Sequence, residues 1–131
     1  GYSSAASDVY KRQTTIYVKA VMSLLDSVKV KAISHITGGG FYENIPRSLP
    51  SGLSVKIARS DVQVLPIFDV IAKRGNIPER DMFNTFNMGV GMTVVVDKAD
   101  ADKAIEAIKA AGEEAYVLGE LVDSDMGVII C

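Results

Sequence analysis

The sequence predicts one domain of the layered α+β class, in which a mostly antiparallel sheet carries its helices on one face. Helix and strand patterns are interspersed along the chain without a regular βα repeat. The last three strand patterns flank a single helix pattern. A length of 131 residues with 48% hydrophobic residues is sufficient for one domain with a core of its own.

The first 13 residues are expected to lie outside this domain. Residues 1–13 are rich in serine and alanine and then polar, and they show neither the two-residue nor the 3.6-residue apolar period. We therefore expect a disordered tail or a remnant of cloning or sequence assembly. The domain itself is expected to span residues 14–131.

Three strands and a helix are expected before the middle of the chain. Residues 14–18 are rich in strand-forming side chains, and apolar residues at 20, 21, 24 and 25 have the spacing of an amphipathic helix of about two turns. An apolar, β-branched run at residues 28–36 predicts a strand. After a Pro-Ser-Gly turn at 50–52, residues 53–57 alternate between apolar and polar, as in a half-buried strand.

Two helices are expected to begin at prolines. Pro66 has the features of a first helical residue, apolar residues follow at 67, 68, 70 and 71, and Gly75 lies where a C-terminal glycine cap belongs. Pro78 and the acids after it predict the first turn of a second helix, which leads to Phe86. The short, branched apolar run at residues 92–96 predicts a buried strand.

The clearest helix pattern begins near residue 101. Its apolar residues recur at helical spacing, with Asp97 or Asp100 as the expected N-cap and Gly112 as the expected C-cap. Capping accounts for the acids at 97, 100 and 102 better than a metal loop does, so no metal site is predicted.

Two further strands are expected at the end of the chain. Residues 115–122 and 127–130 have strand patterns, and the four residues between them, 123–126, are expected to form a hairpin loop.

Charge and cysteine content exclude several kinds of partner. Lys and Arg number 14 and Asp and Glu 16, for a formal charge of −2 without a basic block, so no nucleic-acid partner is expected. Cys131 is the single cysteine, which excludes an intrachain disulfide and a cysteine zinc site and fits a reducing, cytoplasmic setting. No apolar run approaches the ~20 residues of a membrane span, and no membrane partner is expected.

The candidate site follows the strand at residues 28–36. That strand leads to His35, the one histidine, and then to Thr37 and the triple glycine Gly38-Gly39-Gly40. Bare backbone at the start of a short helix presents N–H groups to an anion such as phosphate, and an imidazole beside it can exchange protons near neutral pH. The alternatives are a tight turn that needs positive φ and a histidine hydrogen-bonded at a strand end.

Four further polar or glycine residues are candidate ligand contacts. Asn44 and Arg47 are three residues apart, which places them on one side of the short helix if the helix persists past Pro46, and Arg47 offers a forked donor to phosphate. Asn87 precedes Gly89, where its amide can reach a ligand that approaches the backbone. The alternatives are a surface arginine and an asparagine that ends a helix with local hydrogen bonds.

These stretches together carry a family resemblance over about residues 14 to 123. The chain resembles the C-terminal domain of phosphoribosylformylglycinamidine cyclo-ligase, also called AIR synthetase, in five stretches, which are HITGGGF (35–41), ENIPR (43–47), PIF (66–68), MFNTFNMGVGM (82–92) and GEEAYVLGE (112–120). Their order and spacing make the match specific.

The resemblance implies an ATP-dependent ring closure in purine biosynthesis. In that family the formyl amide oxygen of formylglycinamidine ribonucleotide is phosphorylated at the expense of ATP, the amidine nitrogen attacks the activated carbon, and phosphate leaves to give aminoimidazole ribonucleotide. The family is a homodimer of two-domain chains, and its N-terminal domain holds the main ATP and Mg²⁺ groups. The present chain would then be the substrate-binding half, inactive alone, with His35, the glycine loop and Asn87 in the cleft.

Two other readings remain open. One is a sibling of the same superfamily, such as formylglycinamidine synthase, selenophosphate synthetase or thiamine monophosphate kinase. The other is a non-catalytic α+β module that binds a small ligand or mediates dimerisation without a partner domain.

Overall fold

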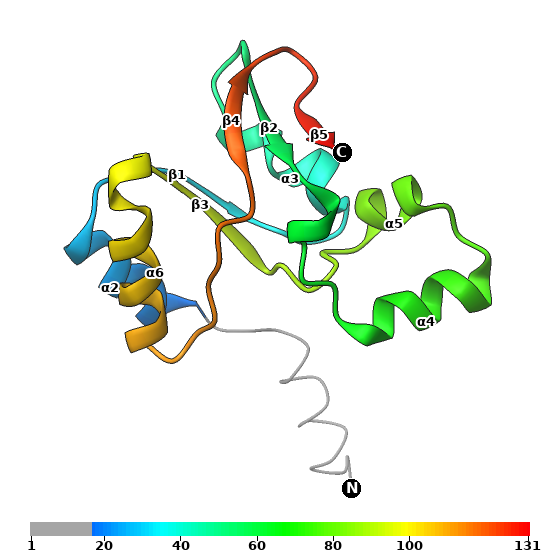
Figure 1. The fold of residues 1–131 in the computed structure, drawn as a ribbon, viewed down its shortest axis with the longest axis horizontal. Helices are drawn as coiled ribbons and strands as arrows, with labels where there is room; N and C mark the ends of the chain where they lie inside the picture. The colour runs from blue at the N-terminus through cyan, green and yellow to red at the C-terminus, as the bar shows by residue number, and fades with distance from the viewer. Residues whose placement is uncertain (1–16) are drawn as a thin grey trace, which may run out of the picture.

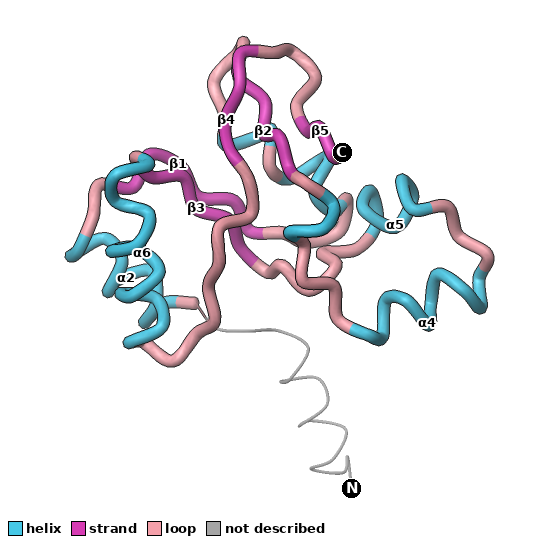
Figure 2. The backbone as a smooth tube through the Cα atoms, in the orientation of Figure 1, coloured by secondary structure: helices cyan, strands magenta, loops and turns pink. Residues whose placement is uncertain are grey.

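The computed structural model describes residues 17–131, which form helices and two small sheets (Figures 1 and 2). The predicted α+β class is confirmed. The tail predicted at residues 1–13 and most of the strand predicted at 14–18 lie outside the described residues, and the domain boundary at residue 14 stays a prediction. Val18 lies in a helix, so that part of the strand prediction is wrong.

The first sheet is a two-stranded antiparallel ribbon with two helices packed on it. β1 (Val30–His35) pairs with β3 (Met92–Val96), and the register runs from Val30 opposite Val96 to His35 opposite Met92. The two helices, α2 (Val18–Ser27) and α6 (Ala101–Ala110), lie side by side at one end of the molecule (Figure 1). Burial of Leu24, Val28 and Ala104 joins them to the sheet.

The second sheet has three strands, with β2 in the middle. β2 (Leu53–Ile57) pairs antiparallel with β4 (Glu120–Asp123) and parallel with β5 (Val128–Ile130). The predicted hairpin between the last two strands is wrong, because β2 lies between them. The predicted strand at residues 115–122 begins only at Glu120.

A buried serine in β2 holds the connection between β4 and β5. The hydroxyl of Ser54, which is fully buried, donates to the carbonyl oxygen of Ser124 at 2.9 Å and accepts from the amide of Gly127 at 2.8 Å. The connection after β4 is therefore attached to β2 and crosses to its other edge, instead of turning back on β4.

The main core lies between this sheet and two short helices. α3 (Gly40–Asn44) packs on α5 (Glu79–Thr85), and the rings of Phe41 and Phe83 meet edge to face with centroids 5.1 Å apart. Both rings are fully buried. The 3₁₀ turn η1 (Pro46–Ser48) continues the chain from α3 toward β2.

The helix that begins at Pro66 differs from its prediction at the C-terminus. α4 (Pro66–Gly75) has Pro66 in its first turn, as predicted, but Gly75 is its last residue and the left-handed cap is Asn76 with φ 49°. The predicted apolar face is only partly covered. Phe68 and Ile71 pack on the core, whereas Ile67 is 56% exposed.

The caps of α6 agree with the sequence at one end only. Gly112 and the next residue donate to the carbonyl oxygens of Lys109 and Ile108 at 3.0 and 3.2 Å, which is a Schellman cap. Asp100 occupies the N-cap position but makes no capping side-chain hydrogen bond, and Asp97, in the turn before η3 (Lys98–Asp100), pairs with Lys31 at 2.5 Å.

The strand predicted at residues 92–96 forms, but it is half-buried along its whole length instead of buried. Helices cover one face of the ribbon that it shares with β1, so its side chains are only partly enclosed. Among the described residues no helix combines the length and apolarity needed to cross a bilayer.

Candidate functional site

The structure brings together the two segments that carry the predicted site. The amide of Ile36 donates to the carbonyl oxygen of Gly91 at 2.8 Å, just past the paired ends of β1 and β3. A few residues on, Gly40 packs against the end of α5, where an added Cβ would lie 2.7 Å from the Phe86 carbonyl oxygen. The histidine and glycine loop therefore lies beside the segment that contains Asn87.

The three glycines of the loop have different surroundings. A side chain at Gly40, with φ 59°, would overlap the carbonyl oxygen of Phe83, and one at Gly39, with φ 95°, would overlap the carboxylate of Glu43. Turn geometry and close packing therefore explain these two glycines. Gly38 is exposed, and a Cβ there would meet nothing within 4 Å. The open backbone of the loop is the part around Gly38.

Asn44 lies beneath the loop and holds it. The side chain is buried, and its Nδ2 lies within hydrogen-bond distance of three carbonyl oxygens, those of Thr37 (3.2 Å), Gly38 (3.2 Å) and Gly40 (2.8 Å). The hydroxyl of Thr37 donates to its Oδ1 at 3.5 Å. This arrangement makes Asn44 a support of the loop, with its amide directed at the protein backbone.

The condition under which Asn44 and Arg47 would share one side of a helix is not met. α3 ends at Asn44, and the chain continues from Pro46 as the 3₁₀ turn η1. Asn44 is buried under the loop, whereas Arg47 is exposed. Proline ends the regular α-helical spacing, so the three-residue interval no longer aligns the two side chains.

Two serines that the sequence analysis missed brace the same loop. Ser34, buried in β1, has its hydroxyl 3.2 Å from the Asn44 carbonyl oxygen and 2.6 Å from the Ser48 hydroxyl. The Ser48 hydroxyl in turn donates to the Ile45 carbonyl oxygen at 3.0 Å. The available signal was the two-residue spacing of Ser34 and Ile36, which places Ser34 on the same strand face as an apolar residue.

Asn87 and Gly89 form a tight local turn. The Asn87 side-chain oxygen accepts from the amide of Gly89 at 3.0 Å, and its carbonyl oxygen accepts from the amide of Val90 at 2.9 Å. A Cβ at Gly89 would lie 3.0 Å from Leu65, so this turn packs against the segment before α4. A role of either residue toward a ligand stays a prediction.

His35 is exposed at the end of β1 and has an aromatic neighbour. The ring of Tyr17 meets the imidazole edge to face, with centroids 6.0 Å apart and planes at 73°. Sequence reasoning did not identify Tyr17, because it is remote from His35 along the chain and belongs to no local motif.

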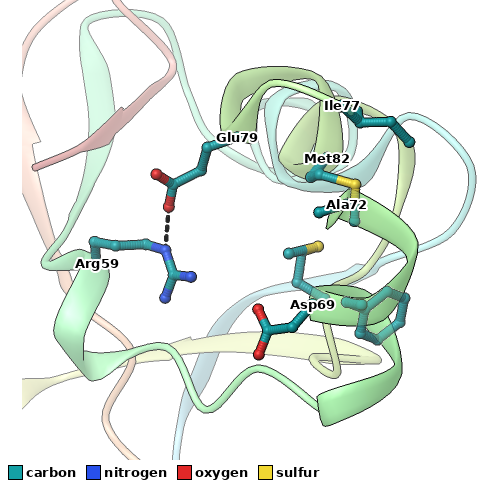
Figure 3. A pocket seen from close by; sticks show the side chains of 8 residues that line it. Arg59, Asp69, Ala72, Ile77, Glu79 and Met82 are labelled. Atoms are coloured by element: carbon teal, nitrogen blue, oxygen red, sulfur yellow. Dashed lines mark hydrogen bonds and ion pairs between the residues drawn. The ribbon is translucent and has the colours of Figure 1, made fainter. Parts of the chain in front are cut away.

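Two cavities lie away from these residues. One, of about 200 Å³, opens between the turn η2 (Arg59–Asp61), α4 and α5 (Figure 3), and its lining is Arg59, Phe68, Asp69, Ala72, Ile77, Glu79, Met82 and Met88. Arg59 pairs there with Glu79, and its guanidinium lies 5.4 Å from the Phe83 ring centroid. A second cavity of about 220 Å³ shares that ion pair. Neither cavity is lined by a predicted site residue.

The described residues include no group of three His, Cys, Asp or Glu side chains placed to hold a metal ion. The acidic side chain nearest the loop is that of Glu43, which lies against Gly39. A phosphate that approached the loop would meet this negative charge as well as the backbone.

Two comparisons of the sequence with known proteins indicate the same family. The sequence model described as "AIR synthase related protein, C-terminal domain" matches residues 2–131. Proteins named phosphoribosylformylglycinamidine cyclo-ligase are similar to the chain. That of Lachnoclostridium phytofermentans is 49% identical over 98% of this chain and 38% of its own length, and that of Agathobacter rectalis is 53% identical over 88% and 34%. The chain thus spans little more than a third of these relatives.

Solved structures show the same fold at lower sequence identity. Escherichia coli HypE, a hydrogenase maturation protein, superposes with a TM-score of 0.70 at 21% identity, over 88% of this chain and 36% of that one. At this identity the likeness concerns the fold alone.

Proposed function

Because the chain belongs to the family of AIR synthase related proteins, C-terminal domain, we propose that it is the substrate-binding part of a phosphoribosylformylglycinamidine cyclo-ligase. The observation that carries the proposal is about 50% identity to cyclo-ligases across nearly the whole chain. The 21% identity to HypE favours the cyclo-ligase over a sibling of the same fold.

The proposed substrate is formylglycinamidine ribonucleotide, and the loop after β1 is proposed to bind it. His35, Thr37 and Gly38 are exposed there, and the backbone at Gly38 has room for a ligand group such as the ribose phosphate. Gly39 and Gly40 shape the loop, and Asn44 fixes its carbonyl oxygens inward. Arg47, Asn87 and Gly89 are proposed as outer contacts.

His35 is the proposed proton-handling group. In the ring closure the amidine nitrogen loses a proton as it bonds to the formyl carbon, and the phosphorylated oxygen leaves that carbon as phosphate. An imidazole titrates near neutral pH and can accept the proton or orient the amide. Its exposed position at the strand end, beside the loop, is compatible with either role.

ATP and Mg²⁺ are proposed to be bound by the rest of a full-length protein. The described residues offer no set of metal ligands, so no step is assigned to a metal here. By the same family resemblance the full-length protein is proposed to be a homodimer, and the single cysteine is compatible with a cytoplasmic setting.

Two measurements test the proposal. Formylglycinamidine ribonucleotide is titrated into the chain by calorimetry, and a separately produced N-terminal part of a cyclo-ligase is then added with ATP and Mg²⁺ while phosphate release is followed. We expect phosphate release only with both parts, and its loss in His35→Ala but not in Lys103→Ala, a change of an exposed residue on α6. No binding and no release would refute the proposal.

A dimerisation module is the second candidate function. Exposed apolar side chains on α2, among them Val18 at 68% and Met22 at 55%, are compatible with a self-associating surface. Sedimentation of the chain without ligand distinguishes the two. A stable dimer that ignores the ribonucleotide favours the module.

A further inference from the structure

Tyr17 and Gly91 meet beside the proposed catalytic histidine. The Tyr17 ring lies edge to face with the His35 imidazole, with centroids 6.0 Å apart, within the range of favourable aromatic pairs. A Cβ at Gly91 would overlap the Tyr17 hydroxyl oxygen and lie 2.8 Å from its ring carbon Cζ. The tyrosine therefore occupies the space that any side chain at Gly91 would need.

The backbone around this contact is held on two sides. His35 pairs with Met92 as the last pair between β1 and β3, and the next amide, that of Ile36, donates to the Gly91 carbonyl oxygen at 2.8 Å. Tyr17 comes directly before α2, in which Leu24 is buried in the cluster that packs on the ribbon. Both partners of the aromatic pair are thus attached to the same packed unit.

An exposed imidazole without such a neighbour would sample several rotamers. We propose that Tyr17 is a positioning residue that fixes the orientation of the His35 imidazole beside the glycine loop, and that Gly91 lacks a side chain so that Tyr17 can lie there. The effect of this orientation on catalysis rests on the proposed function, whereas the orientation of the imidazole does not.

NMR spectroscopy of the chain tests the orientation without any ligand. Since the sequence has one histidine, its imidazole gives one set of signals. We expect cross-relaxation between the Tyr17 and His35 rings, retained in Tyr17→Phe. We also expect three-bond couplings of the His35 side chain that report one χ1 rotamer and become averaged in Tyr17→Leu. Gly91→Ala should displace the tyrosine and weaken the same signals. Lys19→Ala, a neighbouring exposed change, is the matched control and should leave them as they are.

The reconstituted reaction tests the consequence. A misoriented catalytic group lowers turnover more than binding. Tyr17→Leu should therefore lower kcat about tenfold with little change in KM, whereas Tyr17→Phe should keep kcat close to that of the unmodified chain. Absence of ring contacts in the unmodified chain, or a single His35 rotamer that persists in Tyr17→Leu, would overturn the proposal.

The two proposals fail separately. If the His35 rotamer becomes averaged in Tyr17→Leu but kcat changes no more than in Lys19→Ala, positioning for catalysis is refuted and the proposed function stands. If the unmodified parts together release no phosphate, the proposed function is refuted, and the NMR result alone decides whether Tyr17 orients His35.

Discussion

The side-chain amide of Asn44 donates to the carbonyl oxygen of Gly40 at 2.8 Å, across the first turn of the helix that the glycine begins. The same nitrogen reaches the carbonyl oxygens of Thr37 and Gly38. One buried side chain therefore lies within hydrogen-bond distance of three backbone acceptors, to which its two N–H groups can donate. The Thr37 carbonyl oxygen also accepts from the Gly40 amide at 3.0 Å. The loop is stiff on its inner side and open at Gly38.

Removal of the Asn44 amide should destabilise the chain. Asn44→Ala removes the side-chain donor to the carbonyl oxygens of Thr37, Gly38 and the buried Gly40, and we expect a loss of about 2 kcal/mol in the free energy of unfolding. Asn44→Asp should cost at least as much, because a carboxylate would face the same acceptors. Urea denaturation measures both, with Asn84→Ala, an exposed residue on α5, as the control. Equal stability of Asn44→Ala and the control would contradict the support role.

Substitution by alanine should affect stability strongly at one glycine of the loop and hardly at another. Gly40→Ala introduces a Cβ that overlaps the Phe83 carbonyl oxygen at a positive φ, and should cost about 2 kcal/mol or more in the free energy of unfolding. Gly38→Ala meets open space and should change stability by less than about 0.5 kcal/mol. Calorimetric titration of the ribonucleotide should nevertheless show weaker binding for Gly38→Ala. Unchanged binding would argue against a ligand at this backbone.

Neutralisation of Glu43 should strengthen phosphate binding. Its carboxylate lies against Gly39, and two like charges at ~4 Å in water repel by about 1 kcal/mol. We therefore expect Glu43→Gln to bind inorganic phosphate and the ribonucleotide about fivefold more tightly at low salt, with a smaller gain as salt rises. Asp102→Asn on α6 is the matched control for net charge. A gain of the same size in the control would show a general charge effect.

Loss of the Ser54 hydroxyl should loosen the end of the second sheet. Ser54→Ala removes a donor to Ser124 and an acceptor for Gly127, and both partners are then left unpaired. We expect about 2 kcal/mol lower stability, and a larger increase in hydrogen exchange at the Gly127 amide than at the amides of β2. Ser60→Ala, at an exposed serine, should change neither.

The pair of Lys31 and Asp97 should make a pH-dependent contribution to stability. The hydrogen bond and positive charge of Lys31 hold the pKa of the Asp97 carboxyl below its ordinary value. The charged carboxylate is therefore favoured by folding. Its stabilisation is present above the ordinary aspartate pKa, about 4, and is lost as pH falls through the lower folded value.

Lys31→Met should raise the Asp97 pKa toward the ordinary value and reduce this acid-side dependence. Carboxyl chemical shifts followed by NMR from pH 6 downward measure it. An unchanged Asp97 titration would mean that the pair does not form in solution.

Part of the fold and of the candidate site could be predicted from the sequence, because it depends on patterns within a few neighbouring residues. The run that ends in His35, the short helix limited by Pro46 and the glycine at 112 as a cap follow from spacing, β-branching and proline chemistry within a few residues. Asn44 was identified as important, but whether it faces a ligand or the loop depends on where the carbonyl oxygens lie. That position follows from the path of the folded backbone.

By itself the sequence determined the α+β class, most of the helices and strands, and the family. Each depends on residue periodicity or on motif order, which the chain carries locally. Tertiary structure alone decided that β2 lies between β4 and β5, that two of the three loop glycines face protein atoms, and that Tyr17 meets His35. These are contacts between residues far apart in the chain, and they are fixed by packing and by the need to pair buried polar groups.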